Sequence, residues 1–141
     1  MKILAVDYGD SRTGLATCDR TEFLTTAITP QITLKARNKV AARVCEVAKE
    51  IEAEMILIGL PLNMDGSTGP QAQKVMDFGA VLEKAGLTVH YQDERLTTVT
   101  AEAVLIGSGV RREDRRRHVD KLAATVILEQ WLASQGRRKE E

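Results

Sequence analysis

The chain has 141 residues, of which 43% are apolar and only 4% aromatic, so we expect one domain with a mostly aliphatic core. Lysine plus arginine equals aspartate plus glutamate at 20 each, which excludes a strong overall field that would draw the protein to nucleic acid or to a membrane surface. The two cysteines, Cys18 and Cys45, stand far apart and in no metal-ligand pattern, which argues against a disulfide framework or a zinc site.

Three strands joined by tight polar turns are predicted in the first part of the chain, over residues 2–6, 13–18 and 22–28. Their short spacing predicts an antiparallel meander, which we expect to end at Pro30. An amphipathic helix is then predicted over residues 34–52, because its apolar side chains fall on one helical face.

Strands and helices alternate in the rest of the chain. The apolar run over residues 55–60 is typical of a strand buried on both faces of a parallel sheet. After a polar loop, the pattern predicts a helix over 71–85, a strand over 87–92, a short helix over 100–106 and a last helix over 119–133. This order predicts an α/β fold: a mixed five-stranded sheet, formed by an antiparallel meander followed by parallel strands, with helices on both faces. We expect one domain over residues 1–135 and a charged tail over 136–141.

Acidic residues stand at the ends of the predicted strands, where ligands of open α/β sheets bind. Asp7 closes the first strand, Asp93 and Glu94 follow the strand over 87–92, and Asp120 opens the last helix. Carboxylates that meet at one edge repel one another unless a cation lies between them. One or two Mg²⁺ or Mn²⁺ ions held there would suit cleavage of a phosphodiester bond. Other roles stay open, because Asp7 could accept hydrogen bonds from turn amides and Asp120 could complement a helix dipole.

Four short motifs carry a family resemblance, and in chain order they are Asp7-Tyr8-Gly9 with Arg12-Thr13-Gly14, Gly59-Leu60-Pro61-Leu62 with Asp65-Gly66, Asp93-Glu94-Arg95-Leu96-Thr97-Thr98, and Asp120-Lys121-Leu122-Ala123-Ala124. Together they resemble the YqgF/RuvX family from Met1 to about Ala133. That resemblance implies a ribonuclease H-like fold and a cytoplasmic nuclease, a hydrolase that matures the 5′ end of pre-16S ribosomal RNA during ribosome biogenesis. It also implies an alternative, a Holliday junction resolvase that acts on branched DNA in recombination and repair. The implied catalytic and metal-binding residues are Asp7, Glu94 and Asp120, with the choice between Asp93 and Glu94 not forced.

Basic and polar side chains near these motifs are predicted to bind the substrate. Arg115, Arg116 and Arg117 belong to a basic run just before Asp120 in an otherwise neutral chain, which favours contacts with a nucleic-acid backbone. The backbone amides of the loop over residues 59–69 could hold a phosphate. The full predicted set of substrate-binding residues is Arg12, Asn63, Arg95, Arg115, Arg116, Arg117 and Lys121. The expected partner is structured RNA, with branched DNA as the alternative, bound by a monomer or a weak homodimer.

Two other functions compete with the nuclease reading. The first hairpin also looks like the phosphate-binding hairpin of the actin, sugar-kinase and Hsp70 superfamily, but those proteins close a second domain over ATP and this chain is short for that. A non-catalytic RNA-binding factor would need the arginines but not the carboxylates. We expect no membrane partner and a cytoplasmic location, because the first apolar run is interrupted at Asp7 and no stretch is long enough to span a bilayer.

Overall fold

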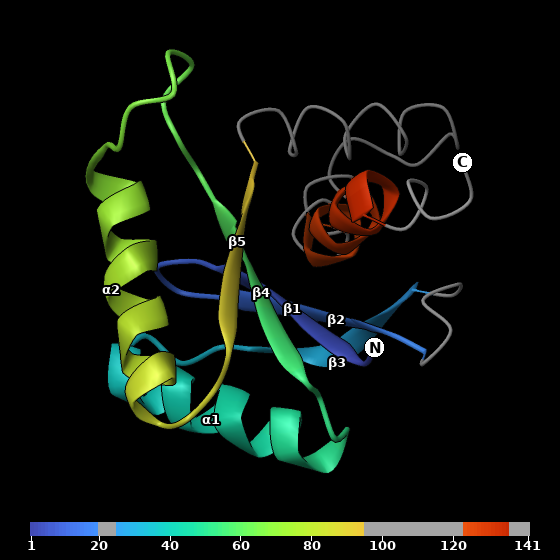
Figure 1. The fold of residues 1–141 in the computed structure, drawn as a ribbon. Helices are drawn as coiled ribbons and strands as arrows, with labels where there is room; N and C mark the ends of the chain where they lie inside the picture. The colour runs from blue at the N-terminus through green and yellow to red at the C-terminus, as the bar shows by residue number, and fades with distance from the viewer. Residues whose placement is uncertain (20–24, 95–122, 136–141) are drawn as a thin grey trace, which may run out of the picture.

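The centre of the molecule is a five-stranded mixed sheet with the strand order β3-β2-β1-β4-β5 (Figure 1). The computed structural model describes residues 1–19, 25–94 and 123–135. The strands β1, β2 and β3 form an antiparallel meander, and β4 and β5 continue the sheet in parallel with β1. The predicted mixed sheet is therefore confirmed. The strand bounds are β1 (Ile3–Tyr8), β2 (Thr13–Cys18), β3 (Thr25–Ile32), β4 (Met55–Leu60) and β5 (Val89–Asp93).

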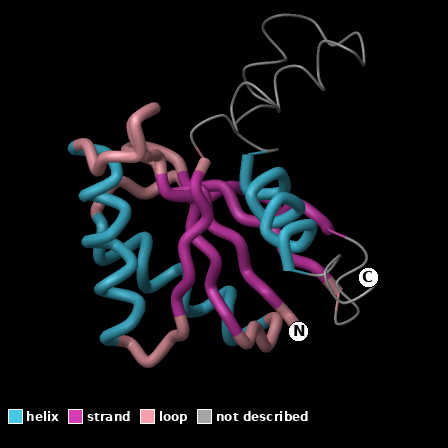
Figure 2. Tube along the Cα trace, turned by 45° about the horizontal axis from the view of Figure 1, so that its top comes forward, coloured by secondary structure: helices cyan, strands magenta, loops and turns pink. Residues whose placement is uncertain are grey.

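Both faces of the central strand β1 are apolar, because it is covered on each side by helices. Leu4 and Val6 face the helices α1 (Arg37–Glu50) and α2 (Pro70–Lys84). The two side chains form one buried cluster with apolar residues of both helices. Ile3 and Ala5 face the opposite way and pack with the helix over residues 123–135 in a second cluster. Figures 1 and 2 show the helices on the two sides of the sheet. The predicted cover of both faces is confirmed.

The expectation that Pro30 ends the meander is wrong, because β3 continues through Pro30 to Ile32. The pairing of β2 with β3 shifts between Thr13, which pairs with Ile32, and Leu15, which pairs with Ile28. Pro30 therefore lies in an irregular part of the ladder on an edge strand. Proline is tolerated at such places, since its missing N–H removes no regular hydrogen bond there.

The other predicted elements are found with ends that differ by a few residues. The first helix begins at Arg37 rather than at residue 34, and the strand expected over 87–92 is β5, Val89–Asp93. The last predicted helix is described from residue 123 to residue 135. The short helix expected over 100–106 and the first residues of the last helix lie outside the described residues. In the described part of the chain, every helix is too short or too polar to cross a bilayer.

Candidate active site

Asp7 lies near the carboxyl end of β1, on the face that the C-terminal helix covers. Side chains alternate along a strand, so Asp7 follows Ile3 and Ala5 on the face that packs with residues 123–135. The next residue, Tyr8, points to the opposite face. Its ring stacks on Phe78 of α2 with the ring centroids 4.1 Å apart and the planes 10° apart. This stacking holds the end of β1 against α2 and so fixes the backbone that carries Asp7.

Glu94 follows the last residue of β5 and is tied to β4 by its backbone. Its N–H donates to the carbonyl oxygen of Leu60 at 3.1 Å. The side chain of Glu94 reaches back over Gly59, because a Cβ built on that glycine would stand only 2.5 Å from Oε2 of Glu94. The same Cβ would stand 2.5 Å from Cδ1 of Ile127 in the C-terminal helix. The Glu94 carboxylate therefore occupies the space that the missing side chain leaves between β4 and this helix.

The strand register brings Asp7 and Glu94 to the same part of the sheet. Val6 pairs with Ile58 across the parallel β1–β4 ladder, so Asp7 is level with Gly59. Gly59 pairs in turn with Gln92 of β5. Gly59 lies between the two acidic residues, and its lack of a side chain leaves the space over β4 open to them.

Burial and neighbouring charge raise the pKa of Glu94 from its ordinary value to about 8. Burial of the carboxyl group is the largest cause, followed by the negative charge of Asp7 and then that of Asp93. Because the charge of Asp7 contributes to the raised pKa of Glu94, the two carboxylates interact across the sheet, although they are far apart in the sequence. A half-buried pair of this kind is costly when both groups are ionised, and a divalent cation between them removes the cost.

Asp93 lies differently from Glu94. It is exposed and pairs with Leu60 at the end of the β4–β5 ladder. Leu60 packs against the cluster of α1 and α2, so the alternation of side chains places Asp93 on that face, whereas Glu94 lies over Gly59 on the other. The sequence did not force a choice between the two, and the geometry favours Glu94 as the partner of Asp7.

A polar cavity of about 230 Å³ adjoins Asp7 at the β1–β2 turn. Arg12 lines this cavity together with Asp7, so a cation and a carboxylate face the same small space. The turn is so tight that a Cβ built on Gly9 would clash with the carbonyl oxygen of Arg12. The other lining residues are Gly9, Asp10, Ser11, Gly14 and Gln31.

Of the remaining predicted site residues, the structure describes only Asn63. Asn63 lies in the loop between β4 and α2, where its Nδ2 donates to Oγ of Ser67 at 2.9 Å. Within residues 1–19, 25–94 and 123–135, no group of three His, Cys, Asp or Glu side chains is arranged to hold a metal ion. The predicted third carboxylate and most predicted cations lie outside the described residues, and they are Asp120, Arg95, Arg115, Arg116, Arg117 and Lys121.

The sequence analysis placed Gly59 in a family motif but did not assign it the part that it has in positioning Glu94. A glycine inside an apolar strand marks a close approach of some other group, and the run over residues 55–60 contains that signal. The group that approaches is the carboxylate of Glu94.

A family model described as "RuvX: Holliday junction resolvase" matches residues 1–134. The chain belongs to the RuvX family. The resemblance that the four motifs indicated is thereby confirmed. The match covers β1, which carries Asp7, and the strands β4 and β5, which position Glu94.

Relatives of this RuvX chain share its length as well as its sequence. A protein of Syntrophus aciditrophicus is 41% identical over 140 residues, which cover 99% of this chain and 93% of that one. A protein of Caldanaerobacter subterraneus subsp. tengcongensis is 41% identical over 137 residues, covering 96% and 98% of the two chains. Both relatives carry the name "Putative pre-16S rRNA nuclease".

Solved structures show the fold of this RuvX chain. RuvC of Thermus thermophilus, in complex with a Holliday junction substrate, superposes with a TM-score of 0.57 at 18% identity and covers 96% of each chain. The large terminase nuclease of the thermophilic phage G20c superposes with a TM-score of 0.59 at 8% identity, covering 96% of this chain and 82% of that one. The predicted ribonuclease H-like fold is confirmed.

Proposed function

We propose that this protein is a metal-dependent nuclease that hydrolyses phosphodiester bonds in the maturation of the 5′ end of pre-16S ribosomal RNA. The observation that carries the proposal is the meeting of Asp7 and Glu94 at one edge of the sheet, where the negative charge of Asp7 helps to raise the pKa of Glu94. Membership of the RuvX family and the names of the relatives supply the substrate class. Work on pre-16S RNA would place the protein in the cytoplasm.

The donor set fits Mg²⁺ or Mn²⁺. Both ions prefer oxygen ligands, and Mg²⁺ keeps several of its waters, so two or three carboxylates suffice. Asp7 and Glu94 would hold the ion, with Asp120 as the third ligand that the sequence predicts. A bound ion of this kind activates a water and stabilises the leaving oxygen of a phosphodiester.

Side chains of this protein would control the proton on Glu94, hold the phosphate and limit the access of water. Glu94 must give up its proton before it binds a cation, because its pKa of about 8 keeps it largely protonated at neutral pH. Arg12 would hold a non-bridging phosphate oxygen in the cavity beside Asp7, since its guanidinium fork matches a phosphate. Cδ1 of Ile127 lies beside the Glu94 carboxylate over Gly59, and this apolar side chain would limit the access of water from that side.

Replacing Asp7 by Asn tests the proposal. We expect Asp7→Asn to abolish Mg²⁺- or Mn²⁺-dependent cleavage of a pre-16S RNA fragment while RNA binding persists, because the change removes a ligand charge and leaves the shape. Asp77→Asn is the matched control, since Asp77 lies on α2 and its carboxylate accepts a hydrogen bond from Gln73 at 3.0 Å. Cleavage by Asp7→Asn at the wild-type rate would overturn the assignment. A wild type that binds RNA without cutting it would make the protein a binding factor.

A second candidate substrate is branched DNA, which the description of the family favours. Symmetric cleavage of a four-way junction requires two active sites related by a two-fold axis. The test therefore measures cleavage of a four-way DNA junction and of the RNA fragment by the same preparation, with both substrates at the same concentration. The oligomeric state of that preparation is measured alongside. Paired cuts in the junction by a dimer would favour the resolvase, and cuts in the RNA alone by a monomer or weak homodimer would favour the RNA nuclease.

A further inference from the structure

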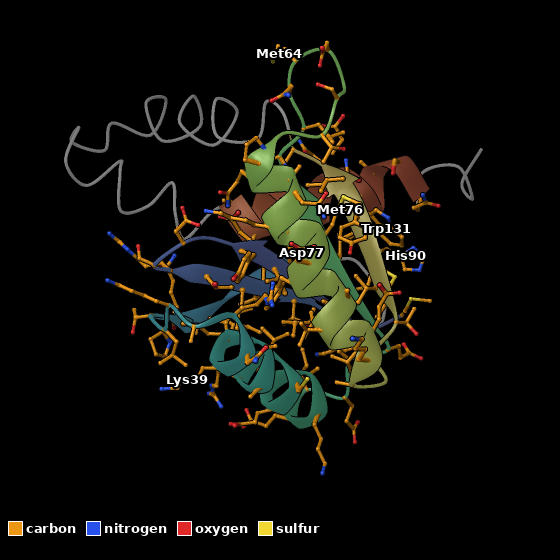
Figure 3. All side chains as sticks on the ribbon, turned by 90° about the vertical axis from the view of Figure 1, so that its left-hand side faces the viewer. Lys39, Met64, Met76, Asp77, His90 and Trp131 are labelled. Atoms are coloured by element: carbon orange, nitrogen blue, oxygen red, sulfur yellow. The ribbon has the colours of Figure 1, made fainter. Side chains whose placement is uncertain are left out.

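A second cavity lies beside the β1–β2 turn, on the face of the sheet that α1 and α2 cover. Its volume is about 240 Å³, and its lining residues are Tyr8, Asp10, Lys35, Arg37, Lys74 and Asp77. They come from the end of β1, the turn after it, the beginning of α1 with the residues just before it, and the first half of α2. Figure 3 looks onto this side of the molecule, with α1 and α2 in front and Asp77 labelled on α2. Separate segments of the chain thus build one polar cavity.

Lys35 and Arg37 bring two positive charges to this cavity. Neither side chain forms an ion pair or a hydrogen bond within the part of the chain that the structure describes. The third cation, Lys74, lies 3.4 Å from a carboxylate oxygen of Asp10. The carboxylate of Asp77 accepts a hydrogen bond from another residue of α2. The carboxylates of the cavity are therefore engaged, whereas two of its cations are available to an anion.

Two further features of the second cavity favour an anion. The N-cap of α1, Ala36, forms no side-chain hydrogen bond, and the first turn has no acidic residue, so the positive end of the helix dipole is uncompensated between Lys35 and Arg37. Burial, as the largest cause, raises the pKa of the Tyr8 hydroxyl, which keeps it protonated and able to donate. Cations and hydrogen-bond donors in one cavity are the chemistry of a phosphate site.

The second cavity meets the candidate active site at Asp10. That residue also lines the cavity that holds Asp7 and Arg12, so the two cavities adjoin at the turn between β1 and β2. The end of β1 divides between them, since Asp7 lines the first cavity and Tyr8 the second. A backbone with a phosphate at Asp7 can therefore continue over the turn into the second cavity. This continuity favours a nucleic-acid strand over a free phosphate as the occupant.

We propose that Lys35 and Arg37 bind a phosphate of the RNA strand where that strand leaves the active site over the β1–β2 turn. This inference rests on the proposed nuclease function and adds a path for the substrate. The RNA bends around the sheet edge, from the face that the C-terminal helix covers to the face that α1 and α2 cover. The guanidinium fork of Arg37 matches two phosphate oxygens, and Lys35 supplies a point charge beside it.

The test locates this phosphate by removing its charge. In a series of labelled RNAs, one phosphate at a time is replaced by an uncharged methylphosphonate next to a 2′-O-methyl sugar, and the reference RNA carries that sugar with an ordinary phosphate. The protein carries Asp7→Asn, so the RNA is bound without being cut, and fluorescence anisotropy measures the affinity. We expect a loss of about tenfold at one or two positions near the cleavage point, and a similar loss on all charged RNAs when Arg37→Ala is added.

The two losses should not add at the position that Arg37 contacts, because both changes remove the same interaction. Lys35→Ala should show this coupling at the same phosphate. Lys39→Ala is the matched control, since Lys39 is an exposed cation of α1 that does not line the cavity (Figure 3). With Lys39→Ala the methylphosphonate loss should stay at about tenfold.

Fully additive losses for Arg37→Ala at every phosphate, or equal coupling for Lys39→Ala, would overturn this phosphate site and leave the nuclease standing. The cleavage assay with an intact Asp7 is a separate measurement. If the wild type cuts no RNA, the nuclease fails, and the coupling between Arg37 and one phosphate still decides the contact because it needs binding alone.

Discussion

At the scale of single residues, the site depends on a glycine as much as on its carboxylates. Glu94 can lie beside Asp7 because Gly59 has no side chain, and its Oε2 occupies the place that a Cβ would crowd. The position of a ligand carboxylate is sensitive to the groups that support it, and loss of such support typically costs about 10- to 100-fold in metal affinity.

We expect Gly59→Ala to lower the affinity for Mn²⁺ by about tenfold or more, because the added methyl pushes the Glu94 carboxylate away from Asp7. Isothermal titration with Mn²⁺ measures this. Gly79→Ala is the control, since its methyl would clash with the Tyr91 hydroxyl instead. Both variants should lose stability, but only Gly59→Ala should lose metal affinity. Equal affinities for the two variants would show that Gly59 does not position Glu94.

The candidate site was predictable from the sequence only in part, and the reason is physical. Asp7 and the pair Asp93 and Glu94 were found because a carboxylate at the end of a strand must lie at the sheet edge, but the sequence did not force the choice between Asp93 and Glu94. The part of Gly59 in positioning Glu94 was not predicted, because a glycine signals that something approaches the backbone but does not say which group approaches.

At the scale of elements, the C-terminal helix both completes the second core and covers the site. Ile127 and Leu128 are fully buried against the sheet, and Cδ1 of Ile127 lies beside the Glu94 carboxylate. Burial is the largest cause of the raised pKa of Glu94. The helix therefore contributes to the burial that raises the pKa of Glu94.

The pH dependence of Mg²⁺ binding follows from that burial. Glu94 holds its proton below a pKa of about 8, so between pH 6 and 8 the affinity should rise about tenfold per pH unit and then level off. Ile127→Val removes Cδ1 at a cost of about 0.5–1.5 kcal/mol and lets water reach Glu94, which should move the profile to lower pH. Titration calorimetry at several pH values measures both.

Ile3→Val is the matched control for this prediction, because Ile3 is fully buried in the same cluster at the far end of β1. It makes the same chemical change and should leave the profile in place. A pH-independent affinity in the wild type, or equal profiles for the two valine variants, would contradict the role given to the helix.

The elements themselves were mostly predictable from the sequence. β2 and β4 were predicted with their observed bounds, because a period of two or a continuous apolar run marks a strand without help from its neighbours. Pro30 misled the prediction, since a proline ends a regular strand but is accepted where the pairing on an edge strand is irregular. Only the pairing partner reveals that irregularity.

At the scale of the whole molecule, a neutral chain must bind nucleic acid through local charge. The formal net charge is zero, so attraction to a phosphate backbone depends on where the cations gather. The sequence places five arginines between residues 111 and 117, outside the described residues. Their contribution to RNA binding can be measured by substitution.

We expect the triple change of Arg115, Arg116 and Arg117 to Ala to weaken RNA binding at low salt. Each lost phosphate contact removes about 0.7 to 0.9 from the slope of log affinity against log salt, so the slope should fall by about 2 to 3. Fluorescence anisotropy with a labelled RNA from 50 to 300 mM salt measures it, and the pair Lys49→Ala and Lys84→Ala, at the last turns of α1 and α2, is the control. An unchanged slope would remove these arginines from the interface.

The central claim is that Asp7 and Glu94 hold a common divalent cation. A crystal grown at a pH above 8 and soaked in Mn²⁺ tests it most directly, because the anomalous signal of manganese locates the ion among the side chains. We predict a peak within coordination distance of both carboxylates, lost in Asp7→Asn. A peak elsewhere, with the two carboxylates unbridged, would contradict the account.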